Sequence, residues 1–141
     1  MIKNCIVPLT NDVNRILNSF VNFSIDMISV VDDTDKKTNK KNIGNIEIII
    51  CYGNDQPSLG INLASGFERF IIGLAICIAL TQITMFAKPN FFIVDEGWSC
   101  MDSNNRDNVE IFMKYIKNLY DHVIIISHLD ELLVRKSLLC Y

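Results

Sequence analysis

The sequence predicts an α/β fold in which a parallel sheet is flanked by helices and is preceded by a helix and a β-hairpin. Two short apolar segments, 91–96 and 122–128, each end in polar residues and are joined by an amphipathic helix, which is typical of a βαβ unit. Two segments rich in Ile and Val, 23–31 and 46–52, enclose a polar stretch and predict the hairpin. At 141 residues and 50% hydrophobic content, the chain can bury one sizeable core.

Composition limits the class of protein. The formal net charge of -3 argues against a surface that binds nucleic acid unaided, because phosphate neutralisation needs clustered Lys and Arg. The five cysteines are scattered and form no C-x-x-C pair, so neither a disulfide framework nor a zinc site is expected, and the compartment is intracellular. No secretory signal is visible at the N-terminus. The many Asn and Ile residues hint at an AT-rich genome, such as that of a large DNA virus or a parasite.

The first predicted helix covers residues 10–22. Its apolar residues recur with the spacing of one helix face and are Val13, Ile16, Leu17, Phe20 and Val21. Beyond the first strand, the basic run 36–41 follows three aspartates, so it is interpreted as part of a solvated hairpin loop and not as a nucleic-acid contact.

The longest apolar segment follows, with eighteen uncharged residues between Arg69 and Lys88. Its length allows a membrane span. However, Ser65 and Glu68 form an S-x-x-E capping box that predicts a helix start, and a buried strand begins directly after Pro89. We therefore interpret residues 65–87 as the core helix of a soluble domain and keep the membrane span as the alternative.

Both strands of the predicted parallel sheet end in polar residues that could bind a ligand. Asp95 and Glu96 end the first strand, and Ser127 and His128 end the second, after a helix over 103–120. Ligands of open parallel sheets bind at the carboxyl ends of the strands. One carboxylate can hold Mg²⁺ while its neighbour orients a water for attack on a phosphoryl group.

Three segments, in this order, resemble motifs of ABC-type ATPase heads: LASGFERFIIGLAICIAL, FFIVDEGWSCMD and HVIIISHLDEL. They resemble the signature motif, the Walker B motif with its D-loop, and the switch histidine. The best match is the SMC and double-strand-break-repair branch, which includes the SbcC-like exonuclease subunits. The resemblance covers residues 61–133 well and implies the C-terminal half of a P-loop ATPase head.

The resemblance implies that ATP and Mg²⁺ are the cofactors, and it implies nucleotide-binding residues. Ser65 and Gly66 resemble the signature residues that touch the γ-phosphate of ATP held by the opposing head, and Glu68 belongs to the same motif. Asp102 resembles the D-loop aspartate that communicates across the dimer.

The remaining roles implied by the resemblance lie at the two strand ends. Asp95 resembles the Walker B aspartate that acts on Mg²⁺, and Glu96 resembles the catalytic base that positions the hydrolytic water. His128 resembles the switch histidine, a second catalytic residue.

The sequence departs from the family pattern in three places. Phe67 replaces the second signature glycine, and Gly97 stands where many ABC proteins have proline. Most important, no G-x-x-x-x-G-K-[ST] motif is present. We therefore expect one C-terminal lobe, 1–141, in which 1–60 forms the helix and hairpin and 61–141 carries the motifs, and we expect it to be inactive alone.

The expected partners follow from the resemblance. A P-loop-bearing N-terminal lobe, in another chain or a missing segment, would complete the head, which would dimerise head to head. A nuclease subunit, and DNA bound through the assembled complex, are further expected partners, and no membrane is expected. The alternative function is a degenerate dimerisation or regulatory module of the same fold without turnover.

Overall fold

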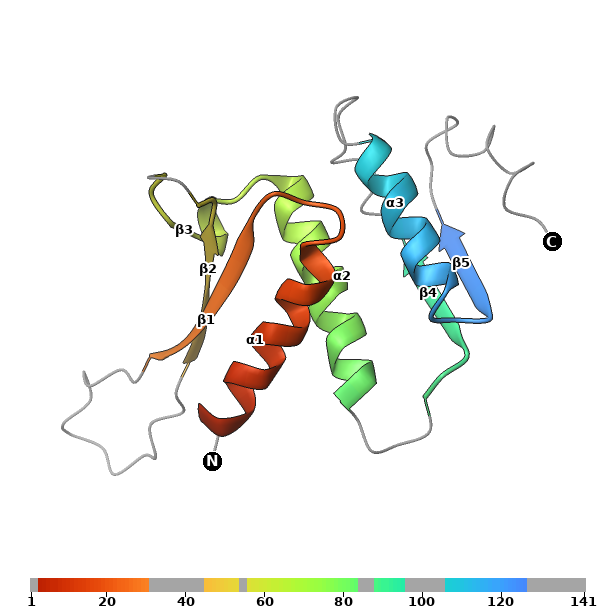
Figure 1. The fold of residues 1–141 in the computed structure, drawn as a ribbon, viewed down its shortest axis with the longest axis horizontal. Coiled ribbons are helices and arrows are strands. Elements are labelled where there is room, and N and C mark those ends of the chain that lie inside the picture. The colour runs from red at the N-terminus through yellow and green to blue at the C-terminus, as the bar shows by residue number, and fades with distance from the viewer. Residues whose placement is uncertain (1–2, 31–44, 54–55, 84–87, 96–105, 127–141) are drawn as a thin grey trace. The chain divides into compact units, whose positions relative to one another are not determined.

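The structure is a computed structural model that describes residues 3–30, 45–53, 56–83, 88–95 and 106–126 (Figure 1). The elements in chain order are α1 (Lys3–Leu17), β1 (Ser24–Val30), β2 (Asn45–Cys51), β3 (Leu59–Gly60), the 3₁₀ turn η1 (Ile61–Leu63), α2 (Gly66–Ile83), β4 (Phe91–Asp95), α3 (Arg106–Lys117) and β5 (His122–Ile126). The chain divides into two compact units, residues 1–83 and residues 84–141. The expected single lobe with portions 1–60 and 61–141 stays a prediction.

The described residues of the first unit form two helices and a three-stranded antiparallel sheet (Figure 1). β1 pairs with β2 in a register that runs from Ser24 opposite Cys51 to Val30 opposite Asn45, which confirms the predicted hairpin. β3 adds two residues to the other edge of β2 and was not predicted, because two residues are too few to show alternation. The core of the unit includes Ile6, Val13, Ile16, Leu17, Ile25, Met27, Ile50, Phe67, Ile71, Ile72, Ala75 and Ile78.

α1 begins and ends earlier than the predicted helix over residues 10–22. Ile6 is buried and lies seven residues before Val13, so the apolar face extends two turns toward the N-terminus. Pro8 lies inside the helix, where proline is usually a sign of a helix boundary. At the other end, the amides of Ser19 and Phe20 bond to carbonyl oxygens three residues back, which closes the helix after Leu17.

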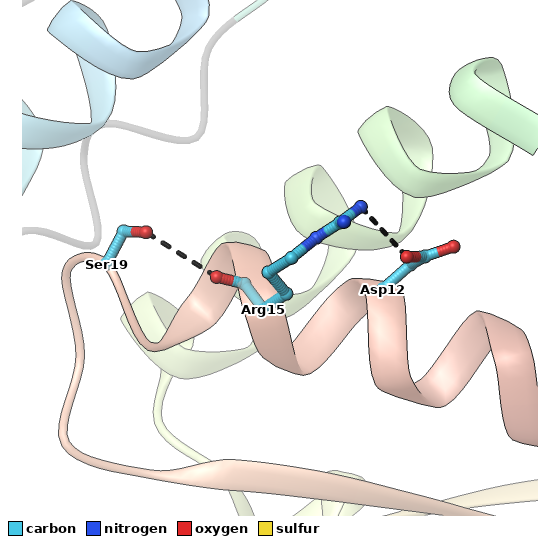
Figure 2. Close-up of polar contacts among 3 residues, drawn as sticks. All are labelled: Asp12, Arg15 and Ser19. Carbon is cyan, nitrogen blue, oxygen red and sulfur yellow. Dashed lines mark hydrogen bonds and ion pairs between the residues drawn. The ribbon is translucent and has the colours of Figure 1, made fainter.

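The exposed side of α1 carries an ion pair, shown in Figure 2. Arg15 donates to Asp12 over 2.9 Å, one turn apart, and the Ser19 hydroxyl donates to the Arg15 carbonyl oxygen over 3.5 Å. Both charged side chains are solvent-accessible, so this pair contributes little to stability. We therefore assign no structural or functional role to this face of α1.

Asn14 joins α1 to the start of β1. Its side-chain amide donates to the Ile25 carbonyl oxygen over 2.9 Å, and its carbonyl oxygen accepts from the Ile25 amide over 2.8 Å. One side chain thus pairs with both backbone groups of one strand residue, as a neighbouring strand would do. This bidentate contact sets where β1 lies against α1.

α2 packs against α1 and buries Phe67, Ile71, Ile72, Ala75, Ile78 and Ala79. Among the described residues it is the one helix long and apolar enough to cross a membrane, judged by length and composition. Core helices of soluble proteins meet the same two criteria. The contacts with α1 and the capped N-terminus of α2 favour the core-helix interpretation.

Over residues 88–95 and 106–126, the second unit contains a parallel strand pair and one helix. β4 and β5 pair in parallel, from Phe91 opposite His122 to Asp95 opposite Ile126, which confirms the predicted parallel pairing. Phe112, Met113 and Ile116 of α3 are buried. Tyr120 lies just beyond α3, and its ring centroid is 5.0 Å from that of Phe92 on β4. This contact holds the end of α3 against the face of the strand pair that carries Phe92.

The other face of the parallel pair is exposed and mainly apolar, with Asp95 and His122 at its two ends. Phe91 and Ile93 on β4 are each 51% exposed, and Ile124 and Ile126 on β5 are 49% and 46% exposed. These residues alternate along their strands with less exposed ones, so they share one face. Parallel sheets are normally covered on both faces.

We predict that Asn14→Ala lowers the free energy of unfolding by about 1 to 3 kcal/mol, because it leaves the amide and carbonyl of Ile25 without partners. Urea unfolding followed by circular dichroism measures the change. The matched control is Asn11→Ala on the exposed side of the same helix, which we expect to stay within about 0.5 kcal/mol of the parent. Equal losses in the two variants would contradict the role of Asn14.

Candidate functional site: the start of α2 and the end of β4

The N-terminus of α2 is held by a reciprocal pair of hydrogen bonds. The Ser65 amide donates to Glu68 Oε2 over 2.7 Å, and the Glu68 amide donates to Ser65 Oγ over 3.2 Å. This confirms the predicted capping box, with Ser65 as the residue before the helix and Gly66 as its first residue. Three of the four predicted nucleotide-binding residues, Ser65, Gly66 and Glu68, therefore lie together.

A further residue completes this arrangement. The Tyr52 hydroxyl, just beyond β2, donates to Glu68 Oε1 over 2.7 Å, so each oxygen of the carboxylate accepts a strong hydrogen bond. Sequence reasoning missed Tyr52, because it lies sixteen residues before Glu68 and belongs to no motif. The signal was indirect: a tyrosine at the end of a predicted hairpin strand, whose hydroxyl needs a partner when its ring is partly buried.

The contact shifts the pKa values of both partners. Partial burial and the Glu68 carboxylate raise the pKa of Tyr52 to about 12. For Glu68, burial acts to raise the pKa, but the hydrogen bonds from Tyr52 and the Ser65 amide outweigh it and leave the pKa below its ordinary value. The neutral phenol and the ionised carboxylate are therefore the forms that fit the folded structure.

Two amides of the first helical turn stay open. The amides of Gly66 and Phe67 have no acceptor among the described residues, whereas that of Glu68 is taken by Ser65. Ser65 and Gly66 are exposed, while Phe67 is buried in the core. Free amides and the helix dipole favour an anion at this position.

The carboxyl end of β4 carries one of the predicted strand-end residues. Asp95 is the last residue of β4, lies opposite Ile126 of β5 and is exposed. A carboxylate oxygen is a ligand of the kind that Mg²⁺ prefers. The described residues hold no cluster of three or more His, Cys, Asp or Glu side chains that suits a metal ion.

The other predicted site residues, Glu96, Asp102 and His128, lie outside the described residues. Ser127, next to His128, lies outside them too. Ser65 and Asp95 belong to different units. The structure thus groups the signature residues and places Asp95 at a strand end.

Two sequence relatives are informative. An uncharacterized protein of Acanthamoeba polyphaga mimivirus is 53% identical over 136 residues, which make up 94% of this chain and 10% of the relative. The DNA double-strand break repair Rad50 ATPase of Archaeoglobus fulgidus is 30% identical over 98 residues, 69% of this chain and 11% of the relative. The chain therefore spans about a tenth of the length of the curated relatives it matches. It matches no protein-family model.

Solved structures of SMC heads share the fold. A structure from work on ATP-driven dimerization and DNA-stimulated activation of SMC ATPases superposes with a TM-score of 0.64 at 17% identity, covering 92% of this chain and 72% of the other. The Smc head domain of Pyrococcus furiosus, bound to the C-terminal domain of ScpA, gives 0.59 at 17% identity over 89% of this chain and 29% of the other. These matches confirm the predicted fold class.

We predict that the contact between Tyr52 and Glu68 makes stability depend on pH at both extremes. Because the folded-state pKa of Tyr52 is raised from 10 to about 12, its contribution is present below pH 10 and is lost as pH rises toward 12. Because the pKa of Glu68 is lowered, its contribution is present above pH 4.5 and is lost as pH falls through the folded-state pKa.

Urea unfolding across pH measures both effects. The stability difference between the parent and Tyr52→Phe should shrink from pH 10 to 12, and the difference between the parent and Glu68→Gln should shrink below pH 4.5. Differences that stay constant over these ranges would show that the contact does not form.

Proposed function

We propose that this chain, an SMC/Rad50-like ATPase head region by its fold and its sequence relatives, is the C-terminal lobe of such a head. In this proposal it supplies the signature motif, the Walker B carboxylates and the switch histidine for ATP hydrolysis, together with a P-loop-bearing partner segment. The assembled head would act in DNA repair or recombination, because the relative from Archaeoglobus fulgidus is a double-strand break repair ATPase.

The observation that carries the proposal is the N-terminus of α2, which is exposed, capped and has amides without an acceptor among the described residues. Ser65 and Gly66 are exposed, two amides are open, and the capping box holds the first turn in place. A γ-phosphate presented by an opposing head would meet these amides at the positive end of the helix dipole.

Phe67, which replaces the second signature glycine, is compatible with this role. Only 7% of the residue is exposed, so its ring belongs to the core of the first unit and leaves the helix end accessible. Its backbone amide has no acceptor among the described residues. The substitution therefore changes the core of the first unit and leaves the donors at the helix end in place.

The carboxylates would divide the chemistry. Asp95 is exposed at the end of β4, and its hard oxygen donors fit Mg²⁺, which when bound neutralises charge on the phosphates. Glu96 would orient the hydrolytic water and accept its proton, and His128 would contact the γ-phosphate from the end of the second strand. Asp102 would bridge to the opposing head.

A partner lobe is supported by the open face of the parallel pair. Phe91, Ile93, Ile124 and Ile126 expose an apolar surface that parallel sheets normally bury. The chain contains no P-loop of its own. A P-loop-bearing lobe that packs on this face would bury the exposed apolar residues and would supply the missing P-loop.

Further partners remain part of the proposal. The related SMC structures concern ATP-driven dimerization and a complex with ScpA, which supports a head-to-head dimer here. A nuclease subunit and DNA would join the assembled complex, inside a cell. The mimivirus relative supports an origin in a large DNA virus.

We predict that Asp95→Asn and Glu96→Gln fail differently in the head assembled with its P-loop segment. Asp95→Asn should weaken Mg²⁺-dependent nucleotide binding, because a neutral amide is a poor ligand for a hard dication. Glu96→Gln should keep binding, slow hydrolysis by about 10² to 10⁴ fold and accumulate an ATP-bound dimer. Turnover, nucleotide binding and light scattering measure these three effects.

Two controls accompany this experiment. The chain alone should show no turnover, because the P-loop supplies most phosphate contacts. Ser65→Arg should block the dimer while leaving nucleotide binding to the P-loop segment unchanged. If Glu96→Gln hydrolyses ATP like the parent, the catalytic proposal is wrong, and the non-catalytic dimerisation module takes its place.

We predict that Ile124→Asp prevents assembly with the P-loop segment, because it buries a charge in the proposed lobe interface. The chain itself should unfold at nearly the parent urea concentration, since Ile124 is 49% exposed. Co-purification and urea unfolding test the two expectations. Glu110→Lys, on the exposed side of α3, is the control and should assemble normally. A folded Ile124→Asp variant that assembles fully would contradict the proposed interface.

A further inference from the structure

We propose that Tyr52 is a positioning residue that sets the geometry of the helix end meeting the γ-phosphate. The proposal rests on the proposed function of Ser65 and Gly66. It also stands on a chain of contacts that runs from α1, across the hairpin, to the first turn of α2. Tyr52 does not touch the nucleotide in this proposal and acts through Glu68.

The hairpin register brings Tyr52 to its place. Ser24 pairs with Cys51, so the next residues outward along the two strands, Phe23 and Tyr52, stand opposite each other. Their rings meet edge to face with centroids 6.0 Å apart, and Phe23 is buried. Two residues further on, Ile25 is held by Asn14 of α1. The phenol therefore projects from a well-anchored position.

Tyr52 and Ser65 together determine where the Glu68 charge lies. Tyr52 donates to Oε1 over 2.7 Å and the Ser65 amide donates to Oε2 over 2.7 Å, so each oxygen is already engaged and competes less for the amides of Gly66 and Phe67. An ionised carboxylate near the proposed phosphate site repels the phosphate, and this repulsion is weaker when the carboxylate is held to one side and hydrogen-bonded. The phenol keeps Glu68 as a cap and keeps its charge away from the open amides.

The first test uses the chain alone and needs no nucleotide. In Tyr52→Phe, the pKa of the Glu68 carboxyl, followed by carbon-13 NMR, should rise because a donor to the ionised form is lost. Hydrogen exchange at the Ser65 amide should become about 3- to 10-fold faster, because its acceptor is less well held. Tyr120→Phe, in the other unit, is the matched control and should leave both readouts at Glu68 and Ser65 unchanged.

The second test uses the head assembled with its P-loop segment. Tyr52→Phe should raise the ATP concentration for half-maximal turnover by about 3- to 30-fold, while turnover at saturating ATP stays within about two-fold of the parent. Adding Tyr52→Phe to Glu68→Gln should cause little further change, because the charge that Tyr52 restrains is gone. A loss of stability alone would not produce this dependence on Glu68.

The outcomes separate the two proposals. An unchanged Glu68 pKa and unchanged Ser65 exchange in Tyr52→Phe would overturn the positioning role, whatever the ATPase result. Normal turnover of the parent head with an unchanged half-maximal ATP concentration in Tyr52→Phe would overturn it as well. A parent head that shows no turnover would instead overturn the proposed function. Tyr52 would then position Glu68 only as a cap that stabilises the N-terminus of α2.

Discussion

The Glu68 carboxylate is the point on which the proposed site depends. Its two oxygens accept from the Tyr52 hydroxyl and the Ser65 amide, and its own amide donates to Ser65 Oγ. One ionised side chain thus contacts the residue after β2 and caps the N-terminus of α2. The amides of Gly66 and Phe67 are the ones left without an acceptor among the described residues. A buried or half-buried carboxylate is stable only when it is hydrogen-bonded, so these partners are needed together.

The second constraint is the exposed apolar face of the parallel pair, as far as the structure describes the second unit. α3 packs against β5, and Tyr120 just beyond it contacts Phe92 of β4, whereas Phe91, Ile93, Ile124 and Ile126 are exposed on the other face. A parallel sheet needs cover on both faces because its strands are apolar throughout. The same unit carries Asp95 at the strand end, so the proposed metal ligand and the proposed lobe interface belong to one small structure.

Much of the fold was readable from local pattern. Two segments rich in Ile and Val around a polar stretch predicted β1 and β2, and the helix between two short apolar segments predicted the parallel pairing of β4 with β5. Helix bounds were less accurate, because Pro8 hid the first turns of α1 and because 3₁₀ contacts end the helix after Leu17. The hydrogen bonds of Asn14 were not predicted, because its partner Ile25 is eleven residues away.

By itself, the sequence determined the α/β class, the capping box of Ser65 with Glu68 and the order of the motifs, because these depend on spacings of a few residues. Only the tertiary structure decided that Tyr52 completes the Glu68 contact and that the Phe67 ring is buried. It also decided which apolar residues of the parallel pair are exposed among the described residues. These features depend on which distant segments pack together. Local pattern does not encode such contacts, because strand register and helix packing bring their partners into reach.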